Sequence, residues 1–184
     1  MHPQSIATAI LLLATSINAV PLEDTTTLLD RPDGGYTIQY NDEGTNTVLK
    51  FTPLADMNFT EVSSVVDRSL ESRSSKSVCE GLILDRTNLI QAWQCLQNLV
   101  GGGLVFGKGQ IGYCKVGSVV VYACNYATNT VTRDTIQNAL STVSLNCGDL
   151  TSGYQRCQSD CGLVDSTIGR KNNGGDFCYS GFTG

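Results

Sequence analysis

The eight cysteines are the residues of this sequence best suited to covalent chemistry. They are Cys79, Cys95, Cys114, Cys124, Cys147, Cys157, Cys161 and Cys178. An even number of cysteines in a short chain is typical of a disulfide framework when the protein matures in an oxidising compartment. We therefore predict that all eight pair in disulfide bonds, while the spacing alone leaves the pairing open.

The composition argues against histidine-based catalysis and against a metal centre. His2 is the only histidine, and it lies in the N-terminal apolar stretch. A Ser-His-Asp triad, a Cys-His pair and a His-ligated zinc all need this side chain. Cys157 and Cys161 have a spacing that a zinc site can use, but no second closely spaced pair completes it. We expect no metal and no cofactor.

Two other patterns resemble catalytic motifs without meeting their requirements. Asp160 and Asp165 are close in sequence, and glycosidases use paired carboxylates, but one such proximity is expected by chance. Gly102–Gly109 nearly matches a phosphate-binding loop, yet Gly109 replaces the Ser or Thr that holds the magnesium ion. We predict a loop there, and we assign no catalytic and no cofactor-binding residue.

Two helices and several strands must position the cysteines. In residues 85–101 the apolar face of a helix is formed by Leu89, Ala92, Trp93, Leu96, Leu99 and Val100. In residues 132–148 the same period is kept by Ile136, Ala139, Leu140 and Val143. Between these helices lie the β-branched runs LVF, QIGYC and SVVVYACNY, and the Gly-rich tail after residue 150 has room for two short strands. We predict an α+β fold: a small disulfide-crosslinked antiparallel sheet with two helices on one face.

The charge changes at the same point in the chain as the cysteine content. Residues 20–73 carry ten acidic and four basic side chains, a net charge of −6, and no cysteine. Residues 74–184 carry seven acidic and eight basic side chains, a net charge of +1. Leu70-Glu71-Ser72-Arg73 resembles the sites at which kexin-type proteases trim fungal secreted pro-proteins. We predict an acidic pro-segment over 20–73, removed after Arg73, and a cysteine-rich domain over 74–184; an uncut linker is the alternative.

The acidic segment also has structure and sites of its own. Apolar and polar side chains alternate over residues 36–40. After the turn sequence NDEGTN, Leu49 and Phe51 can lie on the same face of the hairpin as the apolar side chains of residues 36–40. We predict a β-hairpin that either adds to the edge of the downstream sheet or stays loose, since two strands alone are marginal in water. Asn58 begins the one N-x-S/T sequence and is the predicted glycosylation site.

The first nineteen residues predict export from the cell. The apolar run Ile6–Ile17 is too short to span a bilayer and ends near the small residue Ala19. This is typical of a signal peptide cleaved after Ala19, although the n-region lacks Lys and Arg. We expect a secreted, extracellular protein.

The order of motifs in residues 79–180 resembles small cysteine-rich fungal secreted proteins. The motifs are Trp93-Gln94-Cys95, Gly117–Tyr126, Cys147-Gly148, Gly153-Tyr154 and Phe177-Cys178. This set includes necrosis-inducing effectors of plant-pathogenic fungi and killer-toxin-like α/β sandwich proteins. The resemblance implies a role in virulence or antagonism, and it brings no active-site motif with it.

Together these patterns favour a binding role over catalysis. We expect a virulence factor, crosslinked for survival outside the cell, that binds a host or competitor protein, glycan or membrane as a monomer.

 The mature part is nearly neutral, so we expect no salt-dependent binding of nucleic acid. A small secreted hydrolase, or an inhibitor of one, is the alternative function.

Overall fold

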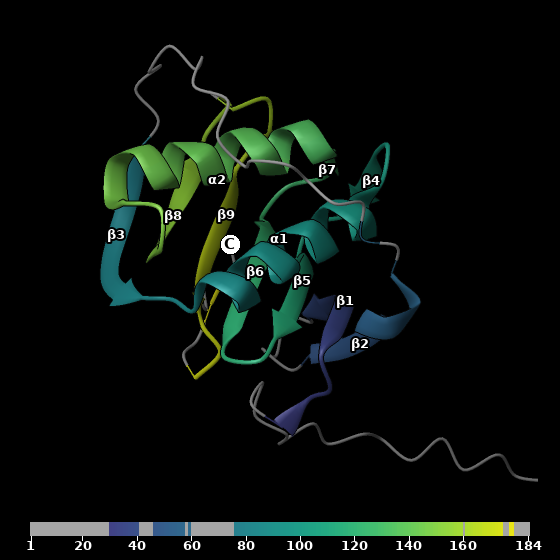
Figure 1. Ribbon diagram of the computed structural model, residues 1–184. Helices are drawn as coiled ribbons and strands as arrows, with labels where there is room; N and C mark the ends of the chain where they lie inside the picture. The colour runs from purple at the N-terminus through teal and green to yellow at the C-terminus, as the bar shows by residue number, and fades with distance from the viewer. Residues whose placement is uncertain are drawn as a thin grey trace, which may run out of the picture.

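The computed structural model describes residues 30–40, 46–57, 59, 76–159, 161–174 and 177–178. Within these ranges the strands and helices follow one another as β1 (Gly34–Tyr40), β2 (Asn46–Pro53), a short 3-10 helix (Leu54–Asp56), β3 (Lys76–Ile83), α1 (Arg86–Val100), β4 (Leu104–Phe106), β5 (Gln110–Val116), β6 (Val119–Asn125), β7 (Asn129–Val131), α2 (Arg133–Cys147), β8 (Thr151–Cys157) and β9 (Ser166–Asn172). The predicted fold class is confirmed: one antiparallel sheet carries both helices on the same face (Figure 1).

Both helices begin and end where the sequence predicts. The Asp85 carboxylate accepts a hydrogen bond from the Asn88 backbone N–H at 2.8 Å, which caps the start of α1. Thr132 caps α2 through a reciprocal pair of hydrogen bonds with Thr135. Gly101 and Gly148 end the two helices, both with positive φ, a conformation that glycine adopts at little cost.

The seven strands of the main sheet lie in the order β2-β1-β5-β6-β9-β8-β3. All neighbouring pairs run antiparallel. The tail thus supplies strands of seven residues each, and β9 lies in the interior of the sheet between β6 and β8. Arg170 and Lys171 belong to β9, although a basic pair before the sequence NNGG is typical of a solvated turn.

The predicted hairpin is present and joins the sheet of the cysteine-rich part. Gly34–Gln39 of β1 pairs with Lys115–Gln110 of β5. Leu49, which the alternation places on the same face as Tyr36, has no partner in β1, because the register shifts after Thr37 and pairs Ile38 with Val48. Leu49 is therefore exposed, whereas Phe51 lies opposite Tyr36 as expected.

The sheet separates two apolar layers. On the helix side the core contains Trp93, as predicted, together with the apolar faces of α1 and α2. On the other side a second layer is rich in tyrosine and includes Phe177 from the C-terminal segment. The sheet is therefore buried on both faces over its central strands.

The segment that resembles a phosphate-binding loop is not simply a loop. Its residues 104–106 form β4, which pairs with β7 in a separate two-stranded sheet. The Gly107 N–H donates to the Gln110 side chain at 2.8 Å, which closes the turn into β5. None of the helices in the described ranges has the length and apolar character needed to cross a membrane.

Candidate functional site

The structure pairs all eight cysteines in four disulfide bonds. Cys79–Cys147 joins β3 to α2, Cys95–Cys114 joins α1 to β5, Cys124–Cys178 joins β6 to the C-terminal segment, and Cys157–Cys161 closes a short loop after β8. Each helix is thus bonded covalently to the sheet. Cys95 and Cys114 are fully buried, because they lie where α1 packs on the sheet.

One row of side chains crosses the whole sheet on the face opposite the helices. The strand registers place Phe51, Tyr36, Tyr113, Tyr122, Gly169, Tyr154 and Val78 side by side, one from each strand. The rings of Tyr36 and Tyr113 stack at 4.7 Å with an interplanar angle of 9°. Cross-strand aromatic pairs of this kind stabilise a sheet.

Gly169 and Phe177 complete this aromatic row. A Cβ at Gly169 would lie 2.6 Å from the Tyr122 ring, so the absence of a side chain lets Tyr122 lie across β9. Phe177 covers the middle of the row, with its ring 4.9 Å from Tyr122 and 5.2 Å from Tyr113. The Cys124–Cys178 disulfide holds this covering segment in place. The centre of the aromatic row is therefore an internal layer and not an open binding platform.

Burial changes the acidity of the tyrosines in this layer. Burial raises the pKa of Tyr36 and of Tyr113 to about 12, against the opposing effect of the Arg31 guanidinium. Arg31 donates a hydrogen bond to the Tyr113 hydroxyl at 2.7 Å. Burial likewise raises the pKa of Tyr122 well above its ordinary value. Burial therefore favours the protonated form of these hydroxyls.

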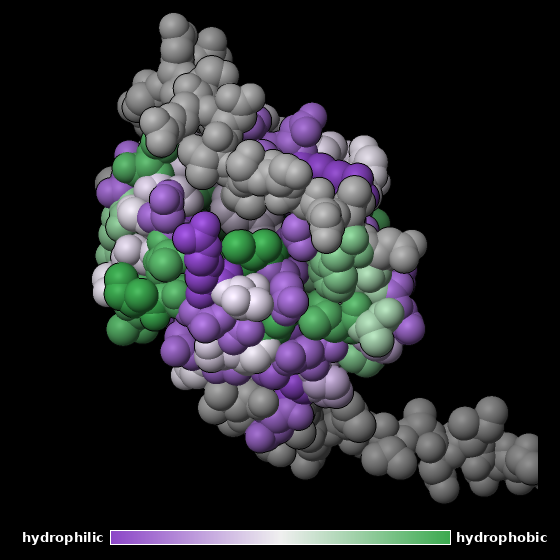
Figure 2. Space-filling view, in the orientation of Figure 1, coloured by the Kyte–Doolittle hydropathy of each residue, from purple (hydrophilic) through white to green (hydrophobic). Residues whose placement is uncertain are grey.

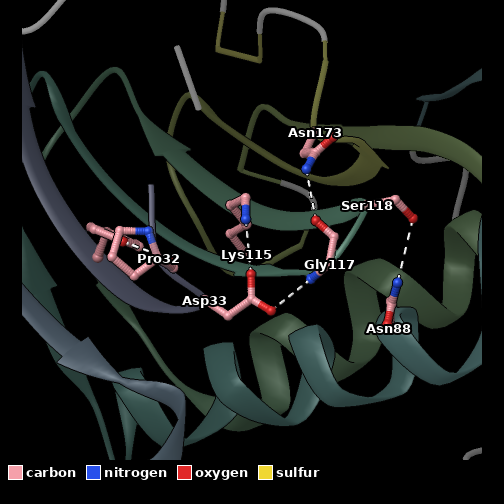
Figure 3. Close-up of polar contacts among 8 residues, drawn as sticks. Pro32, Asp33, Asn88, Lys115, Gly117, Ser118 and Asn173 are labelled. Carbon is pink, nitrogen blue, oxygen red and sulfur yellow. Dashed lines mark hydrogen bonds and ion pairs between the residues drawn. The ribbon is translucent and has the colours of Figure 1, made fainter. Parts of the chain in front are cut away.

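A polar cluster connects the start of β1 to the turn between β5 and β6 (Figure 3). The Asp33 carboxylate accepts from the Lys115 ammonium at 2.8 Å and from the Gly117 N–H at 2.9 Å. Partial burial tends to raise the pKa of Asp33, but the two hydrogen bonds and the charge of Lys115 outweigh it and hold the pKa below its ordinary value. Asn173 extends the cluster by donating to the Gly117 carbonyl at 2.7 Å. The arrangement binds Lys115 firmly and leaves it unsuited to catalysis.

Arg170 is a second buried cation, and its role is structural. Its guanidinium donates to the carbonyls of Thr151 and Gly148 and to the Ser144 hydroxyl, at 3.0, 2.7 and 2.8 Å. These acceptors lie at and just after the C-terminal end of α2, where unpaired carbonyls and the helix dipole favour a cation. Burial lowers the pKa of Arg170 to about 10, which leaves it charged at neutral pH.

Several carboxylates of the described residues have a partner within the fold. Glu80 lies 3.8 Å from Lys171, Asp165 lies 4.0 Å from Arg156, and Asp85 caps α1. Asp160, the other member of the predicted close pair, lies outside the described residues. In the part of the chain that the structure describes, no group of three or more His, Cys, Asp or Glu side chains could hold a metal ion.

Three predicted sites lie outside the described residues. They are the signal cleavage site at Ala19, the glycosylation site at Asn58 and the processing site at Arg73. These sites stay predictions. The predicted boundary between 20–73 and 74–184 is crossed by strand pairing, because the hairpin of the acidic segment belongs to the main sheet.

The outer strand β3 presents the most exposed apolar side chains of the main sheet. Ile83 is 73% exposed and Leu82 is 55% exposed. Figure 2 shows an apolar group at the left edge of the molecule, where Figure 1 places the end of β3. Among the described strands β3 pairs with β8 alone, so no described strand covers its other edge. An open apolar edge is a surface on which another chain can add a strand.

The sequence predicted neither the aromatic row nor the open edge. Alternating apolar residues in β1 and β5 indicate strands, but the row depends on the registers of seven strands that are far apart in sequence. Comparison of the chain with protein-family models, curated proteins and solved structures gives no match.

Proposed function

We propose that this protein is a secreted effector that acts by binding a host or competitor molecule, without catalytic turnover. Its motif order resembles the fungal effector and toxin-like proteins, and four disulfide bonds suit a protein that must survive among extracellular proteases. The paired ionisable groups support this proposal, since the half-buried Asp33 and the buried Lys115 and Arg170 hold the fold together.

The observation that carries the proposal is the exposed apolar edge of β3. Leu82 and Ile83 lie on an open strand whose backbone groups can pair with an extended segment of a target protein. The Cys79–Cys147 disulfide and the pairing with β8 hold this strand in place. A preorganised edge loses less conformational entropy on binding than a mobile loop does.

The test is infiltration of purified protein into plant tissue, with turnover measured in parallel on a panel of polysaccharides. The double variant Leu82→Lys/Ile83→Lys is expected to stay folded and to lose the tissue response. Leu145→Lys is the matched control, because Leu145 is 67% exposed but lies on α2. The control is expected to keep the response.

Two results would contradict this proposal. One is a double variant on β3 that keeps its full activity. The other is polysaccharide turnover that disappears in a folded Asp165→Asn variant, a result that favours the alternative function of a small secreted hydrolase.

A further inference from the structure

The N-terminal segment 30–57 contributes two strands to the sheet without any covalent crosslink to it. Every cysteine of the sequence lies at position 79 or later, so no disulfide can reach this segment. Its covalent connection to β3 runs only through residues 58–75. A cut in that stretch would leave the segment held by noncovalent contacts alone.

These noncovalent contacts extend over both faces of the sheet. On the aromatic face Tyr36 and Ile38 are each only 3% exposed, and Tyr36 stacks between Phe51 and Tyr113. On the helix face Leu54 and Met57 pack against the core. A Cβ at Gly35 would lie 3.3 Å from the Cys114 sulfur, so β1 lies directly against the Cys95–Cys114 disulfide.

Hydrogen bonds and an ion pair join the segment 30–57 to two polar side chains of β5. The Lys115 side chain is only 8% exposed and is bound by Asp33. The Tyr113 hydroxyl accepts from Arg31. Loss of the segment would leave a buried ammonium without its carboxylate and open the edge of β5, both of which are unfavourable.

We propose that residues 30–57 form a separable strand-donating subunit, which stays bound at the outer edge of β5 after the chain is cut between residues 58 and 75. The processed protein is then a noncovalent complex of two chains, and the acidic segment remains part of it. The partner that the β5 edge fits is this chain's own acidic peptide. The inference is independent of the proposed target-binding role of β3, which lies at the opposite edge of the sheet.

The test cuts the folded, full-length protein within residues 58–75 and asks whether the two pieces separate. A kexin-type protease is the first reagent, and a variant with a tobacco etch virus protease site in place of residues 69–74 provides a second, defined cut. The products are compared by size-exclusion chromatography in native buffer and by non-reducing denaturing electrophoresis. We expect one native peak that contains both pieces and two bands after denaturation.

Elution of the acidic peptide apart from the cysteine-rich piece in native buffer would overturn the proposal. Resistance of the engineered site to the protease in the folded protein would overturn it as well. If the tissue response is kept although the acidic peptide dissociates, this proposal is overturned and the proposed effector function is not.

Variants of the cut protein test the contacts themselves. Asp33→Asn is expected to speed the release of the peptide by about tenfold, because it removes the charge that binds Lys115. Tyr36→Ala should speed release further. Asp56→Asn is the matched control, since Asp56 is an exposed carboxylate in the same segment, and it should leave the rate unchanged. Equal rates for Asp33→Asn and Asp56→Asn would contradict the assigned role of Asp33.

Discussion

At the scale of single residues, two buried cations of this protein hydrogen-bond to groups at the ends of strands and helices. Arg170 lies in β9 but hydrogen-bonds to carbonyls that follow α2. Lys115 lies in β5 but binds the residue that precedes β1. Each cation therefore connects elements that are distant in sequence, and its removal should affect the packing of an element and not only a local contact.

Arg170→Met is expected to lower the free energy of unfolding by about 2–4 kcal/mol, because the carbonyls of Thr151 and Gly148 lose their donors inside the protein. The measurement is urea denaturation followed by circular dichroism. Arg156→Met is the control, since Arg156 is exposed and lies 4.0 Å from Asp165; it should change stability by less than about 0.5 kcal/mol. Equal effects of the two substitutions would show that the contacts of Arg170 do not stabilise α2.

The tyrosines predict how stability depends on alkaline pH. Because burial raises the pKa of Tyr36 and Tyr113 to about 12, the folded state favours the protonated hydroxyls. Their contribution to stability is fully present below the ordinary tyrosine pKa of about 10 and is lost as the pH rises toward about 12. Urea denaturation at about pH 9 and about pH 11 should show this loss. In Tyr113→Phe the loss should be smaller, and an unchanged loss would argue against Tyr113 as its source.

At the scale of the elements, the disulfides join each helix to the sheet. Cys79–Cys147 closes the longest loop, with a sequence separation of 68, and Cys79 is exposed. A substitution at Cys79 leaves no cavity at that position, so the effect of this bond reports mainly on the freedom of the unfolded chain.

Replacing both cysteines, as in Cys79→Ser/Cys147→Ser, should lower the free energy of unfolding by about 4 kcal/mol in the chain-entropy model. Secretion yield should fall as well, because α2 and the edge strand β3 lose their covalent connection. The exposed substitution Leu145→Ser on the same helix should change stability by less than about 0.5 kcal/mol. A double variant as stable as this control would show that packing alone holds α2 on the sheet.

At the scale of the whole molecule, the sheet combines an acidic segment and a cysteine-rich domain in one structure. Its two outer strands differ in origin: β2 comes from the acidic segment and β3 from the cysteine-rich part. The hairpin thus covers the edge of β5, while the exposed Leu82 and Ile83 lie on the outer strand β3 at the opposite edge. The proposed effector role uses the edge of β3, and the proposed two-chain form depends on the pairing of β1 with the edge of β5.

Deletion of the gene should weaken colonisation of the host or competitor and leave growth in culture normal. The reason is that an effector that acts only by binding a host or competitor molecule has no target in culture. The measurement compares infection with growth in the same strain. Restoring the gene with Leu145→Lys should restore colonisation, and Leu82→Lys/Ile83→Lys should not. A growth defect in culture would contradict an effector role.

Local patterns in the sequence were sufficient to predict the extents of the helices, the N-terminal hairpin and the fold class. The spacing of Ile136, Ala139, Leu140 and Val143 depends only on the period of a helix, and Gly101 and Gly148 end helices through their own backbone freedom. The even number of cysteines likewise predicted complete pairing, which the structure confirms.

Only the tertiary structure decided the cysteine pairing, the strand order and the partners of the buried charges. Each of these depends on contacts between residues far apart in the chain, and a local pattern does not specify them. Arg170 illustrates the difference, because its basic neighbour and the following NNGG indicate an exposed turn, whereas strand pairing with β6 and β8 buries it. Leu49 illustrates it again, since a register shift that no local pattern indicates leaves it without a partner in β1 and exposed.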